Sequence, residues 1–146
     1  MLQDPAHRCS ILVVEDEPDL QELLRVALEQ DRYTVTVVDN GRAALAHLRS
    51  TPHTCAIVLD LVLPVMSGRE FRALQLRDRS HAWVPLIVVS GAIEAAREAR
   101  ELGARGFVGK PVDVDRLRLL LRRLGCPIVQ PHSEQRKTSP RLEAHR

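Results

Sequence analysis

Five short apolar runs alternate along the chain with five stretches of helical periodicity. The runs cover residues 10–14, 33–38, 55–59, 84–89 and 105–108. Such an alternation is typical of a parallel sheet with helices on both faces. Four runs are apolar nearly throughout, as in strands buried on both faces, whereas residues 33–37 alternate apolar and polar positions. We therefore predict an α/β fold, a doubly wound five-stranded parallel sheet with five helices, with residues 33–38 as an edge strand.

The helical stretches differ in how much apolar area they offer. The clearest helix follows Pro18 and has one apolar stripe, made of Leu20, Leu23, Leu24, Ala27 and Leu28. Three others are marked by Ala44, Leu45 and Leu48, by Phe71 and Leu74, and by Leu117, Leu120, Leu121 and Leu124 before a stop at Gly125. The fourth helix, at about 93–102, presents mainly Ala95, Ala96 and Ala99. Because alanine buries little apolar area, we expect this helix to be displaced easily.

Length and composition indicate one domain. The chain has 146 residues, of which 45% are hydrophobic, and this suits a single core. After Gly125 the periodicity ends, and Pro127, Pro131 and Pro140 interrupt a polar segment. We predict a domain over residues 8–125 and a disordered C-terminal tail over 126–146, with no helix-turn-helix and hence no DNA-binding domain.

Other features argue against several classes of protein. No apolar run approaches the roughly 18 residues of a membrane span, and no secretory signal is visible, so we expect a cytoplasmic protein. Cys9, Cys55 and Cys126 are odd in number and widely spaced, which favours reduced, mostly buried thiols over a disulfide framework or a zinc site. Residues 1–126 contain 17 basic and 17 acidic side chains, so the net charge indicates no nucleic-acid surface.

Polar residues follow four of the predicted strands. They are Glu15, Asp16, Asp60, Ser90 and Lys110. Ligands of open α/β sheets bind beyond the carboxyl ends of the strands, so these side chains should share one crevice if the first and third strands are neighbours. Carboxylates about 4 Å apart repel by roughly 4 kcal/mol per pair at an effective dielectric near 20, so they need a cation. Oxygen ligands without thiolate or imidazole suit Mg²⁺.

The lysine of this crevice is the only lysine of the predicted domain. Of 21 basic residues, only Lys110 and Lys137 are lysine, which indicates that position 110 requires an ammonium rather than any positive charge. An ammonium reaches one phosphoryl oxygen, whereas a guanidinium favours bidentate geometry. A metal, a hydroxyl and an ammonium around a carboxylate together suggest phosphoryl transfer onto that carboxylate.

At these residues the sequence resembles the receiver domain of bacterial two-component response regulators, in a stand-alone form similar to chemotaxis regulators. Residues 60–68, DLVLPVMSG, look like the phosphoacceptor loop, with an aspartate four residues before a proline and eight before a glycine. The resemblance covers about residues 9–124. It implies a flavodoxin-like sheet of order 2-1-3-4-5 and implies that Asp60 is the phosphoacceptor.

The resemblance also assigns the other site residues. Mg²⁺, or Mn²⁺, would be bound by Asp16, Asp60 and the backbone carbonyl of Val62, with Glu15 acting mostly through water. Ser90 would supply the hydroxyl that contacts the phosphoryl group, Lys110 the phosphate-contacting ammonium and Phe107 the aromatic switch. By the same resemblance, Val62 and Ala92 would occupy positions that tune dephosphorylation. Because neither side chain can orient a water by a hydrogen bond, we expect a long-lived phosphoryl group.

Simpler interpretations exist for single residues. Asp16 and Glu17 precede Pro18 and would also serve as a helix cap. An isolated Asp60 would suit a turn, Ser90 would suit a cap, and Phe107 would suit the core.

The resemblance implies signalling rather than metabolic catalysis. A sensor histidine kinase or a histidine phosphotransfer protein would donate the phosphoryl group, and a downstream protein would bind the surface of helix 4, strand 5 and helix 5. On helix 5, Arg116, Arg118, Arg122 and Arg123 would face either an acidic partner or solvent. A homodimer formed on phosphorylation is a further assembly that the resemblance allows.

Three alternatives differ in class. The first is a phosphorylation-independent interaction module on a receiver fold. The second, a phosphatase similar to haloacid dehalogenases, needs an aspartate two residues after Asp60, where Val62 stands. The third, a nucleotide or flavin site, lacks a glycine-rich loop after the first strand.

Overall fold

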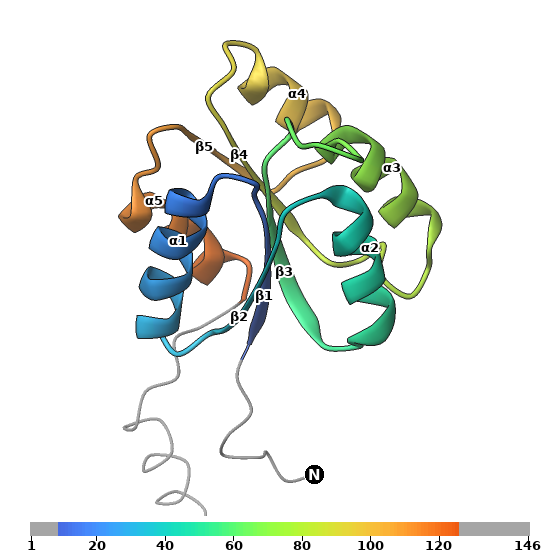
Figure 1. Cartoon of the computed structure of the whole chain (residues 1–146), viewed down its shortest axis with the longest axis horizontal. Helices are drawn as coiled ribbons and strands as arrows, with labels where there is room; N and C mark the ends of the chain where they lie inside the picture. The colour runs from blue at the N-terminus through green and yellow to red at the C-terminus, as the bar shows by residue number, and fades with distance from the viewer. Residues whose placement is uncertain (1–8, 126–146) are drawn as a thin grey trace, which may run out of the picture.

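A computed structural model describes residues 9–125 and confirms the predicted fold. Its five strands are β1 (Ser10–Val14), β2 (Thr34–Val38), β3 (Thr54–Leu59), β4 (Leu86–Ser90) and β5 (Gly106–Gly109). Its five helices are α1 (Pro18–Gln30), α2 (Gly41–Ser50), α3 (Gly68–Arg77), α4 (Ala95–Glu101) and α5 (Val114–Arg123). The strands are all parallel, in the order β2-β1-β3-β4-β5. β2 is an edge strand, as its alternating pattern predicts (Figure 1).

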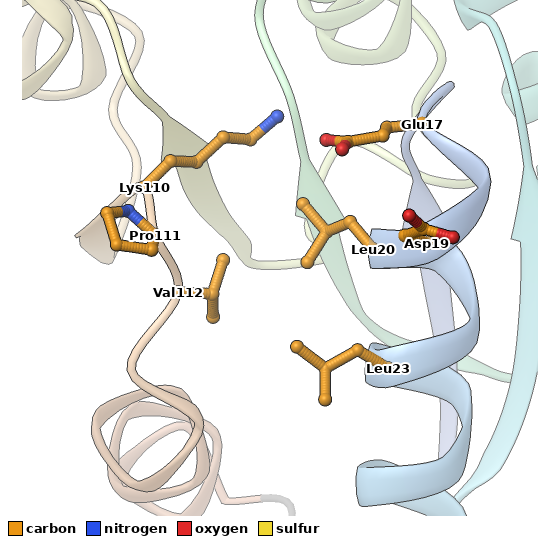
Figure 2. A pocket seen from close by; sticks show the side chains of 7 residues that line it. All are labelled: Glu17, Asp19, Leu20, Leu23, Lys110, Pro111 and Val112. Carbon is orange, nitrogen blue, oxygen red and sulfur yellow. The ribbon is translucent and has the colours of Figure 1, made fainter.

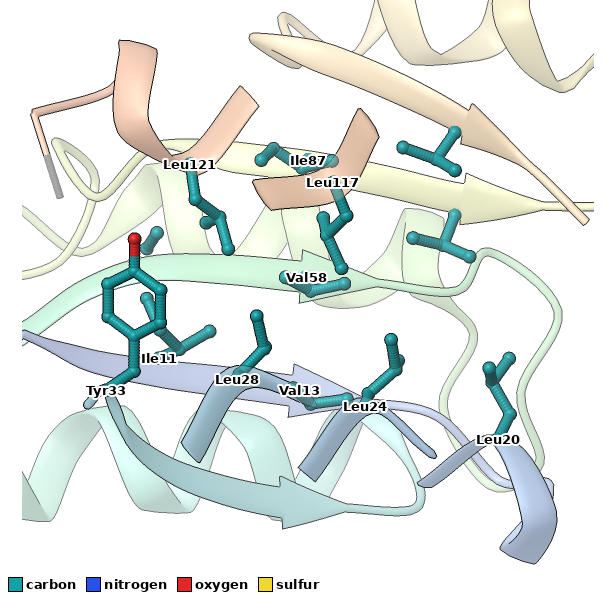
Figure 3. Close-up of a cluster of buried hydrophobic side chains, with 13 residues drawn as sticks. Ile11, Val13, Leu20, Leu24, Leu28, Tyr33, Val58, Ile87, Leu117 and Leu121 are labelled. Atoms are coloured by element: carbon teal, nitrogen blue, oxygen red, sulfur yellow. The ribbon is translucent and has the colours of Figure 1, made fainter. Parts of the chain in front are cut away.

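Helices cover both faces of the sheet, and each face has its own core. α1 and α5 lie on one face, and α2, α3 and α4 lie on the other (Figure 1). The first core joins Leu24 and Leu28 of α1 and Leu117 of α5 to Val13 and Val58 of the sheet (Figure 3). Successive residues of the central strands enter opposite cores, which explains why β1, β3 and β4 are apolar almost throughout.

The boundaries of some strands differ from the predicted ones. β4 begins at Leu86 rather than at Val84, because Pro85 has no N–H to donate to the sheet. Tyr33 precedes β2, since its N–H donates to the carbonyl of Leu28 at the end of α1. β3 begins one residue earlier than predicted, at Thr54, and β5 lies one residue later, at Gly106–Gly109.

The apolar stripes of three helices are narrower than predicted. Leu23 of α1 is 47% exposed because it lies at the edge of the stripe rather than under the helix. α4 begins at Ala95, Ile93 before it is 99% exposed, and Ala96 is only half-buried. In α5 only Leu117 and Leu121 are fully buried, and Leu120 and Leu124 are half-buried. The predicted stop at Gly125 is confirmed, and this glycine has a left-handed φ of 90°.

Polar contacts from α3 hold α4, in addition to its buried Ala95 and Ala99. Arg69 forms an ion pair with Glu98, at 2.6 Å. Arg72, only 7% exposed, donates to the carbonyls of Leu102 at 3.0 Å and Gly103 at 3.3 Å. Burial lowers the pKa of the Arg72 guanidinium. The end of α4 is thus fixed to α3 by hydrogen bonds that hydrophobic periodicity does not predict.

The remaining sequence expectations have mixed outcomes. Cys9 and Cys55 are half-buried at the margin of the first core, so the prediction of mostly buried thiols is wrong for both. Cys126 and the predicted tail lie outside the described residues. Within residues 9–125, no helix combines the length and the apolar character that crossing a membrane requires.

Candidate functional site

Three carboxylates meet at the carboxyl ends of β1 and β3. Glu15 and Asp16 follow β1, and Asp60 follows β3. The two strands are neighbours, and the N–H of Asp60 donates to the carbonyl of Val14 at 3.0 Å. One carboxylate oxygen from each of the three residues lies within 4.8 Å of the others. The structure thus brings together the acidic residues that the sequence predicts for one crevice.

Lys110 reaches this acidic group from the end of β5. Its Nζ lies 2.9 Å from Oδ2 of Asp60 and 3.2 Å from Oε1 of Glu15. Its backbone N–H donates to the carbonyl of Ser90 at 3.1 Å, which fixes the base of the side chain beside β4. The peptide bond between Lys110 and Pro111 is cis. The lysine that the composition singles out is therefore the cation that faces the carboxylates.

Burial and charge act on the acid and on the base in different ways. Glu15 is 2% exposed, and this burial raises the pKa of its carboxyl group. The Asp60 charge raises it further, whereas the N–H of Glu17 and the Lys110 ammonium lower it. Burial by itself would lower the pKa of Lys110, but the hydrogen bonds and charges of Asp60 and Glu15 outweigh it and raise that pKa. Lys110 therefore stays a cation, and the site attracts further positive charge.

The Asp60 carboxylate is held by its own loop. Asp60 is 5% exposed, and its Oδ1 accepts a hydrogen bond from the N–H of Val62 at 3.1 Å. The loop returns to its starting point at Gly68, where a Cβ atom would lie 2.5 Å from the carbonyl oxygen of Asp60. Only glycine permits this close approach. The glycine eight residues after Asp60 thus closes the loop against the strand end.

Ser90 and Phe107 lie on the neighbouring strands β4 and β5. Ser90 is buried at the end of β4, and its Oγ accepts a hydrogen bond from the N–H of Ala92 at 3.3 Å. This contact fits the simpler cap-like interpretation of Ser90. Phe107 is half-buried in β5 and packs against the second core. Val62 and Ala92 are exposed, so their side chains border the site without filling it.

The residues present fit a hard divalent cation. All three side-chain ligands are carboxylates, and two of them, Glu15 and Asp60, are buried. Buried carboxylates at this spacing are stabilised by a metal that accepts oxygen ligands and keeps several waters. The exposed Asp16 leaves one side of the group open to solvent.

A groove adjoins the carboxylates between α1 and the segment after β5. It has a volume of about 290 Å³. Leu20 and Leu23 of α1 face Pro111 and Val112 across it, and Glu17 and Lys110 lie at its upper end, with Asp19 level with Leu20 (Figure 2). Sequence reasoning missed this groove because it counted Leu23 as core. The position of Leu23 at the margin of the α1 stripe was the available indication.

Comparison with known proteins shows the family to which the chain belongs. The family model of the response regulator receiver domain matches residues 11–122. The chain belongs to this family. The matched residues of this receiver domain include the three carboxylates of the site and also Ser90, Phe107 and Lys110.

Two curated relatives of this receiver domain are regulators of which the chain covers about half. It is 37% identical over 125 residues to the transcriptional regulatory protein TcrA of Mycobacterium tuberculosis, covering 83% of this chain and 48% of that protein. It is 39% identical over 127 residues to the sensory transduction protein RegX3 of Mycobacterium bovis, covering 80% of this chain and 52% of RegX3. The chain therefore spans about half the length of these relatives.

Solved structures share the fold of this receiver domain. The chemotaxis response regulator CheY4 of Vibrio cholerae superposes with a TM-score of 0.73 at 25% identity, covering 81% of this chain and 99% of CheY4. The receiver domain of the sensor histidine kinase PA1611 of Pseudomonas aeruginosa gives a TM-score of 0.73 at 29% identity, covering 82% and 99%. That protein has a magnesium ion coordinated in its active-site cleft.

Proposed function

We propose that this receiver domain accepts a phosphoryl group on Asp60 from a phosphohistidine of a sensor kinase or a histidine phosphotransfer protein. The observation that carries the proposal is the position of the Asp60 carboxylate, 2.9 Å from the Lys110 ammonium and beside Glu15 and Asp16. A nucleophile held between a cation and a metal-binding acidic pair suits phosphoryl transfer, which depends on positioning and charge neutralisation.

The transfer itself requires few changes of bonding. An Asp60 oxygen forms a bond to phosphorus as the bond between phosphorus and the histidine nitrogen breaks, and the electron pair of that bond returns to the imidazole. The product is an acyl phosphate on Asp60. Since Oδ1 is held by the N–H of Val62, Oδ2 is the oxygen on the Lys110 side. We assign to Lys110 the role of contacting one phosphoryl oxygen. Its ammonium group stabilises the negative charge on that oxygen.

A divalent cation completes the charge balance of this site. Asp16, Asp60 and the backbone carbonyl of Val62 would hold Mg²⁺, with Glu15 acting through water, and Mn²⁺ would suit the same oxygen ligands. When bound, the metal neutralises charge on the phosphoryl group. The magnesium ion that is coordinated in the active-site cleft of the PA1611 receiver domain supports this assignment.

Phosphorylation would then change the surface of α4, β5 and α5. Ser90 would exchange its contact with the N–H of Ala92 for a phosphoryl oxygen, and Phe107 would turn toward the vacated space. A downstream protein would recognise the altered surface. Arg118 is not available to an acidic partner there, because it pairs with Asp31 at 2.8 Å and donates to the carbonyl of Ala27 in α1. Arg116, Arg122 and Arg123 are exposed and remain candidates.

The groove between α1 and the segment after β5 supports a protein as the phosphodonor. The apolar residues that line this groove lie next to Lys110. A helix that carries a phosphohistidine would therefore bury apolar side chains in the groove while it presents the phosphoryl group to Asp60. A cytoplasmic location, where kinase domains have access to ATP, is part of this proposal.

The proposal is tested by incubating the protein with acetyl phosphate and Mg²⁺ and measuring intact mass. We expect one added phosphate on the wild type and none on Asp60→Asn. Asp31→Asn is a matched control, because Asp31 lies between the end of α1 and the start of β2, at the opposite edge of the sheet from the carboxylate group, and it should gain the phosphate. Equal phosphorylation of Asp60→Asn and wild type would contradict the proposal. An Asp60→Asn protein that still signalled normally would favour the phosphorylation-independent interaction module instead.

A further inference from the structure

The loop after Asp60 contains a strained turn. Val65 has a φ of 68°, in the left-handed region that β-branched residues avoid. Its side chain is 70% exposed, so little burial of its own offsets the strain. The contacts of its neighbours therefore impose the conformation of Val65, and the nearest is the N–H of Met66, which donates across Val65 to the carbonyl of Pro64 at 2.6 Å.

One such contact comes from the start of α2. The N–H of Gly41 donates to the carbonyl of Met66 at 3.0 Å, directly after the strained residue. The N–H of Gly68 also donates to the carbonyl of Leu61 at 3.0 Å. Gly41 thus fixes the far side of the turn, while Gly68 closes the loop upon itself.

Position 41 has room only for glycine. A Cβ atom there would lie 2.8 Å from the Met66 carbonyl oxygen and 3.0 Å from Cβ of Phe71. The first atom is backbone, and Phe71 is fully buried, so neither moves easily. The conformation of Gly41 is not left-handed, so close approach rather than backbone freedom requires glycine here.

We propose that Gly41 is a positioning residue for the Asp60 site, acting through Met66 on the loop that carries Val62. The inference rests on the proposed function, because Val62 is the residue whose N–H holds Asp60 and whose carbonyl would bind the metal. Gly41 itself touches none of the reacting groups. It keeps the loop against α2, and the loop keeps the backbone of Val62 beside the Asp60 carboxylate at 3.1 Å.

The first test compares Gly41→Ala with wild type, using Mg²⁺ alone and no phosphodonor. We expect calorimetric Mg²⁺ affinity to fall roughly 10-fold or more, as for other residues that orient metal ligands indirectly. In the metal-free protein, the Val62 amide resonance should shift. Leu48→Val is the matched control, since it destabilises the same helix from a buried position near the opposite end to Gly41. This variant should lower the melting temperature and leave the Mg²⁺ affinity and the Val62 amide resonance unchanged.

Two further variants separate positioning from packing. Val65→Gly widens the range of backbone angles at the turn, so in the Gly41→Ala background it should restore Mg²⁺ affinity to within roughly twofold of wild type. Val65→Pro forbids the left-handed φ at an exposed position, so it should weaken Mg²⁺ binding while Gly41 is intact. This variant decides the question if Gly41→Ala fails to fold.

The outcomes are distinct. A Gly41→Ala protein with a lower melting temperature, unchanged Mg²⁺ affinity and an unshifted Val62 amide would overturn the inference, as would wild-type affinity in Val65→Pro. Failure of acetyl phosphate to modify the wild type would count against the proposed function alone. If the wild type bound no Mg²⁺, the Val62 amide of the metal-free protein would decide.

Discussion

Lys110 has two charge partners, and its replacements should separate charge from geometry. Lys110→Ala leaves the buried Glu15 and Asp60 carboxylates without their ammonium. We expect phosphorylation by acetyl phosphate to slow by about 100-fold, the scale of losing one electrostatic contact to the transition state. Lys110→Arg keeps the charge but changes its shape, so it should recover only part of the rate. Equal rates for Lys110→Arg and wild type, measured by intact mass over time, would contradict the need for an ammonium.

Val62 bears on the lifetime of the acyl phosphate. Its side chain is 65% exposed and cannot orient an attacking water. Val62→Asn supplies an amide at this position, so we expect the phosphoryl half-life to shorten by about 10-fold, or ~1.4 kcal/mol in the barrier. The decay is followed by mass spectrometry after removal of the donor. The exposed Val26 of α1 offers a control, because Val26→Asn should leave the half-life unchanged.

His47 introduces a pH dependence of stability away from the site. It is half-buried in α2, and burial lowers its pKa from the usual 6.5. The folded state therefore resists protonation, so the stability present above pH 6.5 declines as the pH falls toward the lowered pKa. We expect His47→Gln to reduce this loss between pH 7 and pH 5, measured by urea unfolding. Parallel pH profiles for the two proteins would contradict the assignment.

At the scale of elements, the contact of α3 with the end of α4 yields a stability prediction. Arg72→Met keeps the apolar stem but leaves the Leu102 and Gly103 carbonyls without their donor. We expect a loss of about 2–3 kcal/mol in the free energy of unfolding, and faster amide exchange in α4. Arg69→Met removes only an ion pair whose side chains are 48% and 26% exposed, so it should cost under about 1 kcal/mol. Similar losses for both variants would contradict a special role for Arg72.

The elements themselves were largely predictable. Strands buried on both faces must be apolar throughout, and this requirement made β1, β3 and β4 visible in the sequence and β2 recognisable as an edge. The ends of these strands then indicated Glu15, Asp60 and Lys110. Arg72 could not be found in this way, because it donates to backbone carbonyls about thirty residues away. Likewise, periodicity showed the stripe of α1 but not that Leu23 at its edge lines a groove.

At the scale of the whole molecule, metal binding should stabilise the fold. Mg²⁺ binds the native arrangement of carboxylates, which the unfolded chain lacks. Mg²⁺ at ten times its dissociation constant should add about 1.4 kcal/mol, or roughly 5 °C in melting temperature. Asp60→Asn should show a smaller increase, and the chelator EDTA should abolish it in both proteins. An equal increase in both proteins would place the ion elsewhere.

The contact between Lys110 and Glu15 joins residues 95 positions apart in the chain. During synthesis, the two acidic strand ends emerge long before the cation that neutralises them. A nascent chain that stops before β5 would hold three uncompensated carboxylates, and the native electrostatic balance would arise only when the last strand docks against β4. Asp60 would therefore become able to accept a phosphoryl group only when folding is complete. Incomplete chains would not compete with folded ones for phosphoryl groups.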